Sequence, residues 1–272
     1  MTLVMKFGGA AVATPKHFAK IADVIARRSR HFQRIAVVVS AMANKTDELI
    51  ALAKEVHPSP PRRELDMLVS VGERISISLL AMALAASGKE AISFTGSQSG
   101  IITTTQHADA RIVEVRPWRL LPALEAGKIV IVAGFQGVSR KGEITTLGRG
   151  GSDTTAVALG VALRADKVEF YKDVEGIYSE DPKGHPGAQL FSRLSYDDAV
   201  SLLSQGAKVL HTRCVKLAKK NHLPLHVVSF LRAGELKDAE GTWIGENESL
   251  SDEREVSYEE ERHVETTGFA HV

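Results

Sequence analysis

The arrangement of apolar residues along the chain is the feature that most limits the fold. Short runs rich in Val, Ile and Phe alternate with longer segments whose apolar residues recur at helical spacing. Several short runs are apolar at every position, as strands buried on both faces must be. We expect strands at 3–7, 34–39, 90–94, 128–133, 167–171 and 225–228, and helices at 15–30, 46–56, 62–87, 116–126, 153–164, 195–203 and 205–220. This alternation predicts an α/β fold in which helices cover both faces of a mainly parallel sheet.

Two further segments complete the expected organisation. Residues 137–147, with a turn at Lys141-Gly142, predict a β-hairpin appended to the sheet, and residues 241–245 predict a last short edge strand. Residues 246–272 hold nine acidic and two basic side chains, a net charge of −7, which leaves +8 on residues 1–245. We therefore predict one domain over 1–245, followed by an acidic, mobile tail.

Composition and motifs exclude several classes of protein. The single cysteine, Cys214, rules out an intramolecular disulfide, and the ten histidines show no metal-ligand spacing. No run of Lys and Arg with interleaved aromatic residues occurs, so we expect no nucleic acid partner. Walker A and Gly-x-Ser-x-Gly patterns, a signal peptide and an apolar stretch of membrane-spanning length are also missing from the sequence. We expect a cytoplasmic enzyme that binds no membrane.

Polar and glycine residues follow five of the expected strands, at the edge where parallel sheets bind ligands. In strand order they are Lys6 with Gly8-Gly9, Ser40, Thr95-Gly96, Gly134 and Lys172-Asp173. A lysine followed by two glycines can surround a phosphate with a cation and bare N–H groups. A strand that ends in a solvent-facing lysine and a turn is the alternative. The five strand ends together predict a ligand site better than any one motif does.

A glycine-rich segment, Thr146-Leu147-Gly148-Arg149-Gly150-Gly151-Ser152-Asp153-Thr154-Thr155, leads into one of the expected helices. Glycines let the backbone turn sharply and approach a ligand. The helix directs unpaired N–H groups and a positive dipole end toward the segment. Arg149 adds a fork of donors that suits a carboxylate or a phosphate. The alternative, a hairpin exit capped by Ser152 or Asp153, does not explain two glycines beside an arginine. We predict an anion-binding loop.

Two more segments carry candidates for phosphate binding. In residues 172–183, Tyr178 can pack on a nucleotide base and the lysines can reach its phosphates, although a solvated surface loop fits the same residues. Residues 205–211 are expected to open a helix, where Lys208 opposes the helix dipole unless an anion compensates.

Glu73 lies in a long and largely apolar predicted helix. It is either a buried carboxylate that binds an ammonium group or one half of an ion pair with Arg74.

Taken in order, these segments resemble the aspartokinases of the amino acid kinase family. The matching motifs are Lys6-Phe7-Gly8-Gly9, Ser40-Ala41-Met42 with Thr46-Asp47, Gly72-Glu73-Arg74 and residues 95–103, 146–155, 172–182 and 206–211, within residues 3–245. The resemblance implies that ATP, with Mg²⁺, phosphorylates the side-chain carboxylate of L-aspartate, the first step toward lysine, threonine, methionine and diaminopimelate. It also implies an αβα sandwich around about eight mainly parallel strands. The amino-acid site is expected on the N-terminal half and the ATP site on the C-terminal half.

The resemblance further implies a role for each matching residue. The expected catalytic residues are Lys6, Ser40, Asp153 and Lys208. The expected ATP-binding residues are Lys6, Gly8, Gly9, Lys172, Asp173, Tyr178, Lys183, Lys208 and Val209. The expected aspartate-binding residues are Thr46, Glu73, Arg149, Gly150, Gly151 and Ser152. Arg149 suits the α-carboxylate and Glu73 the α-ammonium group, while Lys6, Lys208 and Mg²⁺ neutralise charge during phosphoryl transfer.

The chain also departs from the family pattern. Ala10-Ala11 replaces the usual Thr-Ser, which removes two hydroxyls near the phosphates, and Lys172, Gln205 and Thr212 stand where Thr, Phe and Pro are usual. The acidic tail stands in place of two regulatory ACT domains. We therefore expect an enzyme without built-in feedback inhibition, whose activity lysine and threonine leave unchanged. We also expect a homodimer.

Two alternatives stay open. One is another kinase of the superfamily, acting on glutamate, acetylglutamate, carbamate or UMP. Glu73 together with Arg149 favours a free amino acid that carries both α groups. The other alternative is a non-catalytic subunit that retains the fold. The double alanine after Gly9 supports it, and Lys6, Asp153 and Lys208 argue against it.

Overall fold

An eight-stranded sheet forms the centre of the protein. The computed structural model describes residues 1–182, 184–232, 240–246 and 256–259. The strand order is β10-β12-β11-β9-β1-β2-β6-β3. Neighbouring strands run parallel except β11 and β12, so the predicted mainly parallel sheet is confirmed. These strands are β1 (Thr2–Phe7), β2 (Arg34–Val39), β3 (Ala91–Phe94), β6 (Ile129–Ala133), β9 (Lys167–Lys172), β10 (Arg193–Leu194), β11 (Leu225–Ser229) and β12 (Thr242–Ile244).

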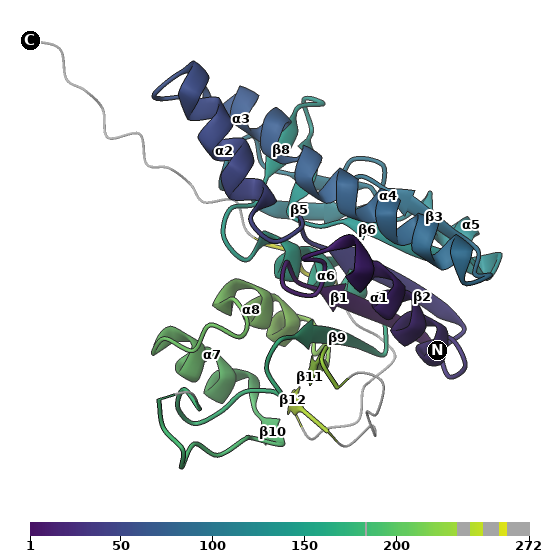
Figure 1. Cartoon of the computed structure of the whole chain (residues 1–272), viewed down its shortest axis with the longest axis vertical. Coiled ribbons are helices and arrows are strands. Elements are labelled where there is room, and N and C mark those ends of the chain that lie inside the picture. Colours follow the sequence, from purple (N-terminus) through teal and green to yellow (C-terminus); the bar gives the residue numbers. More distant parts are fainter. Residues whose placement is uncertain (183, 233–239, 247–255, 260–272) are drawn as a thin grey trace, which may run out of the picture.

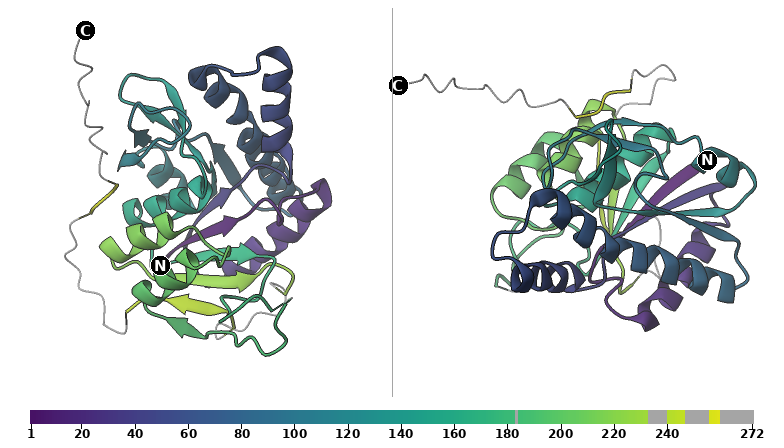
Figure 2. Two further views of the ribbon diagram at one scale, coloured as in Figure 1. Left: turned by 90° about the vertical axis from the view of Figure 1, so that its left-hand side faces the viewer. Right: turned by 90° about the horizontal axis from the view of Figure 1, so that it is seen from above.

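Helices cover both faces of this sheet, as predicted (Figures 1 and 2). Alternate residues of β1 enter two separate cores because successive strand side chains point to opposite faces. Leu3, Met5 and Phe7 pack with α1 (Pro15–Arg28) and α4 (Val71–Ala86). Val4 belongs to the other core, which is completed by α5 (Leu120–Glu125), α6 (Gly151–Ala162), α7 (Tyr196–Ser204) and α8 (Thr212–Lys220).

A second, four-stranded sheet lies beside the main one, in the order β5-β4-β7-β8. Its strands are β4 (Ile101–Thr103), β5 (Ile112–Val115), β7 (Gln136–Ser139) and β8 (Ile144–Thr146). The predicted hairpin is present as β7 and β8, with Gly142 in the left-handed region at φ +83°. It is not appended to the main sheet, however. Phe135 turns the chain at φ +69° directly after β6, so β7 pairs with β4 instead.

The predicted helix 62–87 is interrupted at Ser70 and forms α3 (Arg62–Val69) and α4. The side chain of Gln136 donates a hydrogen bond of 2.8 Å to the Ser70 carbonyl at this break. Residues 62–86 are the one stretch of the described chain with the length and composition to cross a membrane, which corrects the expectation of none. Packing of α4 on α1, β3 and β6 accounts for this apolar character as that of a core helix. The remaining helix, α2 (Lys45–Val56), contacts α3 and α4.

The C-terminal third differs from prediction at two points. Helix α8 begins at Thr212 and not at residue 205, because Gly206 at φ +119° interrupts the helical backbone. His211 caps α8 by accepting the Arg213 backbone N–H at Nδ1, at 3.2 Å. Strand β12 is not an edge strand, since it lies between β11 and β10.

Residues 256–259 of the predicted mobile tail pack against the domain. The Asn221 side chain exchanges hydrogen bonds of 2.7 and 2.9 Å with the Ser257 backbone. Tyr258 contacts the core on the α8 side, and Glu259 N–H donates to the Ile112 carbonyl at 3.0 Å. The prediction of mobility is therefore wrong for these four residues. The rest of the predicted tail after Glu246 lies outside the described residues.

Candidate active site

The carboxyl ends of β1, β6 and β9 contact the N-terminal end of α6, a helix near the centre of Figure 1. Gly134, after β6, packs against Ser152 so closely that a Cβ on Gly134 would lie 2.8 Å from that of Ser152. The Phe135 N–H donates to Thr155 Oγ1 at 3.2 Å. These contacts hold the start of α6 over the strand ends and bring together the segments that the sequence singled out.

Three predicted residues form a buried ion cluster, which we call the Asp153 cluster. Lys6 Nζ lies 2.5 Å from Asp153 Oδ1, and Lys172 Nζ lies 3.1 Å from Asp153 Oδ2. Lys6 comes from β1, Asp153 from the first turn of α6 and Lys172 from the end of β9. The side chains of Lys6 and Asp153 are at most 9% exposed. Lys172 thus supplies a second cation to Asp153.

Burial and the mutual charges set the ionisation of this cluster. Burial opposes ionisation of Asp153, but the charges of Lys172 and Lys6 outweigh it and lower its pKa to about 2. Burial is also the main cause that lowers the pKa of Lys6, assisted by the charge of Lys172 and opposed by Asp153. With both lysines protonated, the cluster holds one positive charge in excess, which suits an anionic ligand.

Glu73 is a buried carboxylate with one unpaired oxygen. Its residue is 3% exposed, and Oε1 accepts the Ala41 N–H at 3.0 Å. Oε2 has no hydrogen-bond partner within the described chain. Burial raises the pKa of Glu73 to about 7, against the hydrogen bond from Ala41 and the charge of Lys6. No ion pair with Arg74 occurs in the described part of the chain, so the structure does not support that alternative for Glu73.

The loop after β1 lies against the loop after β2. A Cβ on Gly8 would lie 3.4 Å from Lys6 Nζ, and one on Gly9 would lie 3.4 Å from the Ala41 carbonyl. Ser40 is half-buried, and its N–H donates to the Phe7 carbonyl at 3.2 Å. Bare backbone and a hydroxyl therefore surround the approach to Lys6. Ala11, in the loop after β1, is buried.

The glycine-rich loop turns through two left-handed glycines, Gly148 at φ +70° and Gly150 at φ +72°. Gly150 lies so close to His211 that an added Cβ would come within 2.3 Å of its side chain. Arg149 is exposed at the tip and lines a cavity of about 430 Å³ with His211 and α8. In the described chain Arg149 makes no hydrogen bond or ion pair with Glu73. Thr46 is half-buried on α2, while Gly151 and Ser152 are buried at the start of α6.

The predicted nucleotide segment follows β9. Asp173 is exposed, and Tyr178 Oη donates to Glu175 at 3.1 Å. Glu175 also pairs with Arg232 at 2.8 Å, and a cavity of about 260 Å³ opens beside these two side chains. The lining of this cavity is Glu175, Leu190, Ser192, Ser229, Arg232, Glu240 and Gly241. Lys183 lies outside the described residues.

Lys208 and Val209 precede α8 and do not lie in its first turn. Lys208 is exposed, and Val209 packs partly against the core. The argument that Lys208 opposes a helix dipole is therefore wrong.

Sequence reasoning missed four side chains. Ser229 and Arg232 line the cavity after β11, and the same rule about polar strand ends would have found them. Asp66 is buried on α3 and accepts hydrogen bonds from Thr146 Oγ1 at 2.5 Å and from the Ala108 N–H at 3.2 Å. Arg213 donates to the Leu147 carbonyl at 2.5 Å. No local sequence signal marks the last two.

The side chains available as metal ligands limit how the predicted magnesium ion could bind. No group of three or more His, Cys, Asp or Glu side chains in the described chain is placed to hold a metal ion. Asp153 is the carboxylate of its cluster, and two lysines already contact it. Because Mg²⁺ commonly binds through one or two carboxylates plus substrate phosphates, a magnesium ion at this site would be held mainly by the phosphates of the nucleotide.

Comparison with solved structures shows the same architecture. The aspartate kinase from Synechocystis matches with a TM-score of 0.82 and 42% identity, over 96% of this chain and 42% of that one. E. coli aspartokinase III in complex with aspartate and ADP matches with a TM-score of 0.81 and 28% identity, over 92% of this chain and 65% of that one.

Sequence comparison agrees. The chain is 49% identical over 228 residues to the aspartokinase of Mycolicibacterium smegmatis, which covers 84% of this chain and 54% of that relative. It thus spans about half the length of the curated relatives it matches. The model of the amino acid kinase family matches residues 1–229. With its αβα sandwich and its site at the carboxyl ends of the strands, the chain belongs to the amino acid kinase family.

Proposed function

We propose that this chain transfers the γ-phosphoryl group of ATP, supplied as its magnesium complex, to the side-chain carboxylate of L-aspartate. A carboxylate oxygen of aspartate forms a bond to the γ-phosphorus. The bond from that phosphorus to the β–γ bridging oxygen breaks, and ADP leaves with this oxygen. The product is an acyl phosphate. Similarity to aspartokinases, one of which is solved with aspartate and ADP, supports this choice within the family.

The observation that carries the proposal is the unpaired oxygen of Glu73 beside the Asp153 cluster. A buried carboxylate oxygen without a partner is costly, and Glu73 Oε2 has none in the described chain. An α-ammonium group supplies both the hydrogen bond and the countercharge. The charge of Lys6 already acts on Glu73, so the bound amino acid and the transferred phosphoryl group share one site.

The remaining predicted residues fit roles around this centre. Lys6 stabilises negative charge on the transferred phosphoryl group, while Asp153 holds Lys6 and Lys172 in place. Gly8, Gly9 and Ser40 offer backbone and hydroxyl donors to the phosphates. Asp173, Tyr178, Lys183 and Val209 line the nucleotide, with Lys208 as an exposed cation that approaches its phosphates.

Arg149 completes the amino-acid site from the tip of the glycine-rich loop. Its guanidinium binds the α-carboxylate in a bidentate manner, with Gly150, Gly151, Ser152 and Thr46 around the rest of the substrate. Arg149 is exposed in this structure, so we expect aspartate to draw it inward.

The test is an ADP-release assay with L-aspartate, L-glutamate, N-acetylglutamate, carbamate and UMP as acceptors. Hydroxylamine traps an acyl phosphate as a hydroxamate and separates carboxyl phosphorylation from plain ATP hydrolysis. We expect only L-aspartate among these acceptors to give ADP, and we expect hydroxamate to form in an equal amount. Preference for another acceptor would assign a different kinase activity of the superfamily, and no acceptor-dependent ADP release would favour the non-catalytic subunit.

The proposal extends to the setting of the enzyme. We propose a cytoplasmic homodimer that serves biosynthesis of lysine, threonine, methionine and diaminopimelate. Analytical ultracentrifugation gives the subunit number directly, and growth of an aspartokinase-deficient bacterium that expresses this chain tests the pathway.

A further inference from the structure

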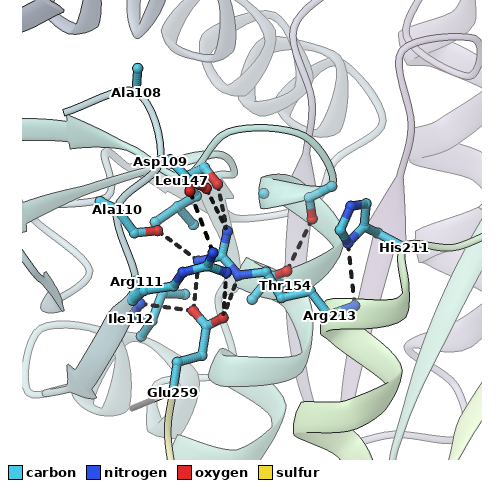
Figure 3. Close-up of polar contacts among 12 residues, drawn as sticks. Ala108, Asp109, Ala110, Arg111, Ile112, Leu147, Thr154, His211, Arg213 and Glu259 are labelled. Atoms are coloured by element: carbon cyan, nitrogen blue, oxygen red, sulfur yellow. Dashed lines mark hydrogen bonds and ion pairs between the residues drawn. The ribbon is translucent and has the colours of Figure 1, made fainter. Parts of the chain in front are cut away.

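The side chain of Arg213 connects three separate segments of the chain (Figure 3). Its Nη1 donates to the Leu147 carbonyl at 2.5 Å, and its Nη2 donates to the Ala110 carbonyl at 2.6 Å. The guanidinium also forms a bidentate ion pair with Glu259, in which Nη2 and Oε2 are 2.7 Å apart. Arg213 is 8% exposed and Glu259 is 10% exposed, so this pair is largely removed from water.

Glu259 is held on its other side by the small sheet. Its N–H donates to the Ile112 carbonyl at 3.0 Å, and its Oε2 accepts the Ile112 N–H at 2.9 Å. Ser257 and Tyr258 anchor the preceding residues through Asn221 and the core. The Glu259 carboxylate is thus fixed at the edge of β5 and directs Arg213 toward the loop.

Leu147 is the residue from which the glycine-rich loop departs. Two left-handed glycines, Gly148 and Gly150, follow it and place Arg149 at the tip. Glycines leave a loop conformationally free unless contacts fix it. Arg213 fixes the Leu147 carbonyl, and its neighbour His211 closes on Gly150.

Charge makes Glu259 necessary for this arrangement. Arg111 Nη1 lies 3.7 Å from Glu259 Oε1, so two guanidiniums face one carboxylate. Among the described residues, the other acidic group near the two arginines is Asp109, which lies 4.0 Å from Arg213 and 3.4 Å from Arg111 and is 49% exposed. Without the charge of Glu259 the two arginines repel each other in a largely buried place, and Arg213 moves away from Leu147.

We propose that Arg213 and Glu259 are positioning residues for the amino-acid substrate: together they hold the glycine-rich loop so that Arg149 meets the substrate α-carboxylate. This inference rests on the function proposed above. It predicts that contacts made by residues 256–259 set the affinity for the amino acid, although these residues touch neither substrate. Misplacement of a substrate-binding group by about 1 Å is enough for a large kinetic effect.

The decisive variant is Glu259→Gln. The amide oxygen of glutamine still accepts the Ile112 N–H, so the segment keeps its docking and loses only the ion pair. We expect the KM for aspartate to rise about tenfold and kcat to change less than about twofold, since loosened substrate positioning weakens ground-state and transition-state binding alike. Arg213→Lys keeps the positive charge but cannot form the bidentate ion pair, so we expect it to raise the KM for aspartate by less than tenfold.

Asp197→Asn is the matched control. It removes an ion pair of 2.6 Å with Lys219, which also lies on α8 but contacts α7 through this pair and is 43% exposed. We expect its kinetics to equal those of the wild type. If Asp197→Asn raised the KM as much as Glu259→Gln does, the effect would belong to α8 in general and the proposal would be overturned.

Hydrogen exchange of the backbone amides of residues 147–151 tests the same idea without any reaction. Faster exchange there in Glu259→Gln, with unchanged exchange in the main sheet, supports the proposal. A folded Glu259→Gln protein with wild-type exchange in this loop and wild-type KM overturns it. Wild-type protein without aspartate-dependent ADP release contradicts the proposed function, and the exchange data then still decide whether Arg213 and Glu259 hold the loop.

Discussion

Strand β9 carries a buried ion cluster on each face, and the two clusters have similar composition. Toward α6, Lys172 joins Lys6 at Asp153. Toward α1, Glu169 is the carboxylate that binds two cations, Lys167 at 2.9 Å and Arg28 in a bidentate manner. Each cluster contains two cations and one carboxylate.

The two clusters differ in their surroundings, because in each of them both carboxylate oxygens are paired with side chains of the fold. Tyr171 Oη donates to Glu169 at 2.8 Å, so both carboxylate oxygens are occupied from within the fold. Lys167 is covered by the rings of Phe32 and Trp243, whose centroids lie 5.5 and 4.7 Å from its Nζ. The Asp153 cluster lies instead beside glycine loops and the unpaired oxygen of Glu73. His226 Nδ1, 4.0 Å from Glu169, also lacks a hydrogen-bond partner in the described chain, so an unsatisfied atom alone does not mark a ligand site. The glycine loops at the strand ends distinguish the Asp153 cluster.

Replacing Lys6 is expected to have the largest effect on activity. In Lys6→Ala the transferred phosphoryl group loses its buried cation, so we expect kcat to fall by about 10²–10³-fold. Stability should change less, because Lys172 still pairs with Asp153. Steady-state ADP release at saturating ATP and aspartate measures kcat, and a value near that of the wild type would contradict the role given to the Asp153 cluster.

The opposite cluster should respond in stability and not in catalysis. Glu169→Gln removes the buried carboxylate that Arg28 and Lys167 share, and we expect a loss of about 3 kcal/mol in the free energy of unfolding. Urea unfolding measures this loss. The control is Glu90→Gln, which removes an exposed pair with Lys128. If Glu169→Gln kept the stability of the wild type but had a strongly reduced kcat, the Glu169 cluster would serve catalysis and not structure.

Replacing Arg149 should act on substrate affinity. Arg149→Ala removes the bidentate partner of the α-carboxylate, so we expect the KM for aspartate to rise by about 10–100-fold with a smaller change in kcat. Arg140→Ala, at an exposed position in the β7–β8 turn, is the control. An unchanged dependence on aspartate concentration would refute the assignment of Arg149.

The ionisation of Glu73 predicts that activity depends on pH, with a smaller effect than the substitutions above. Its pKa is raised to about 7, mainly by burial, and only the carboxylate attracts an ammonium group. The kcat/KM for aspartate should therefore fall as pH drops below about 7, which a pH series measures.

Stability should follow the opposite trend at this group. A folded-state pKa above the unfolded value contributes stability that is fully present at low pH and is lost as pH rises through about 7. Glu73→Gln should then unfold at higher urea than the wild type at pH 8 but not at pH 5, while its activity is lost. If Glu73→Gln and the wild type had the same urea midpoint at each pH, ionisation of Glu73 would not lower the free energy of unfolding.

Most of the main sheet could be predicted from sequence because its strands are buried on both faces. Runs such as 34–39 and 128–133 are apolar almost throughout, so they became β2 and β6 as expected. Strand β4 was not predicted, because it has three residues, too few to show a period, and it pairs with β7, about 36 positions further along the chain. The start of α8 was misplaced because nothing local indicates the positive φ of Gly206.

The residues of the site also divide into those that the sequence predicted and those that it did not. Lys6, Asp153, Glu73 and Lys172 could be chosen from strand ends and motifs, and the structure brings Lys6, Asp153 and Lys172 into contact. Arg213 and Glu259 could not be chosen, because their effect depends on an ion pair between residues 46 positions apart and on carbonyl groups that any sequence would supply.

The central place of β1 in the sheet has a consequence for synthesis of the chain. β1 pairs with β9, and contacts at this junction join residues 164 positions apart, such as Thr2 and Asp166. At a translation rate of about 5–20 residues per second, one edge of a fully buried, apolar strand waits about 10–30 seconds for its partner. During that interval the nascent polypeptide presents an open hydrogen-bonding edge to every neighbouring chain. The free edge of β1 is therefore covered only after about 170 residues have been made, however stable the finished protein is.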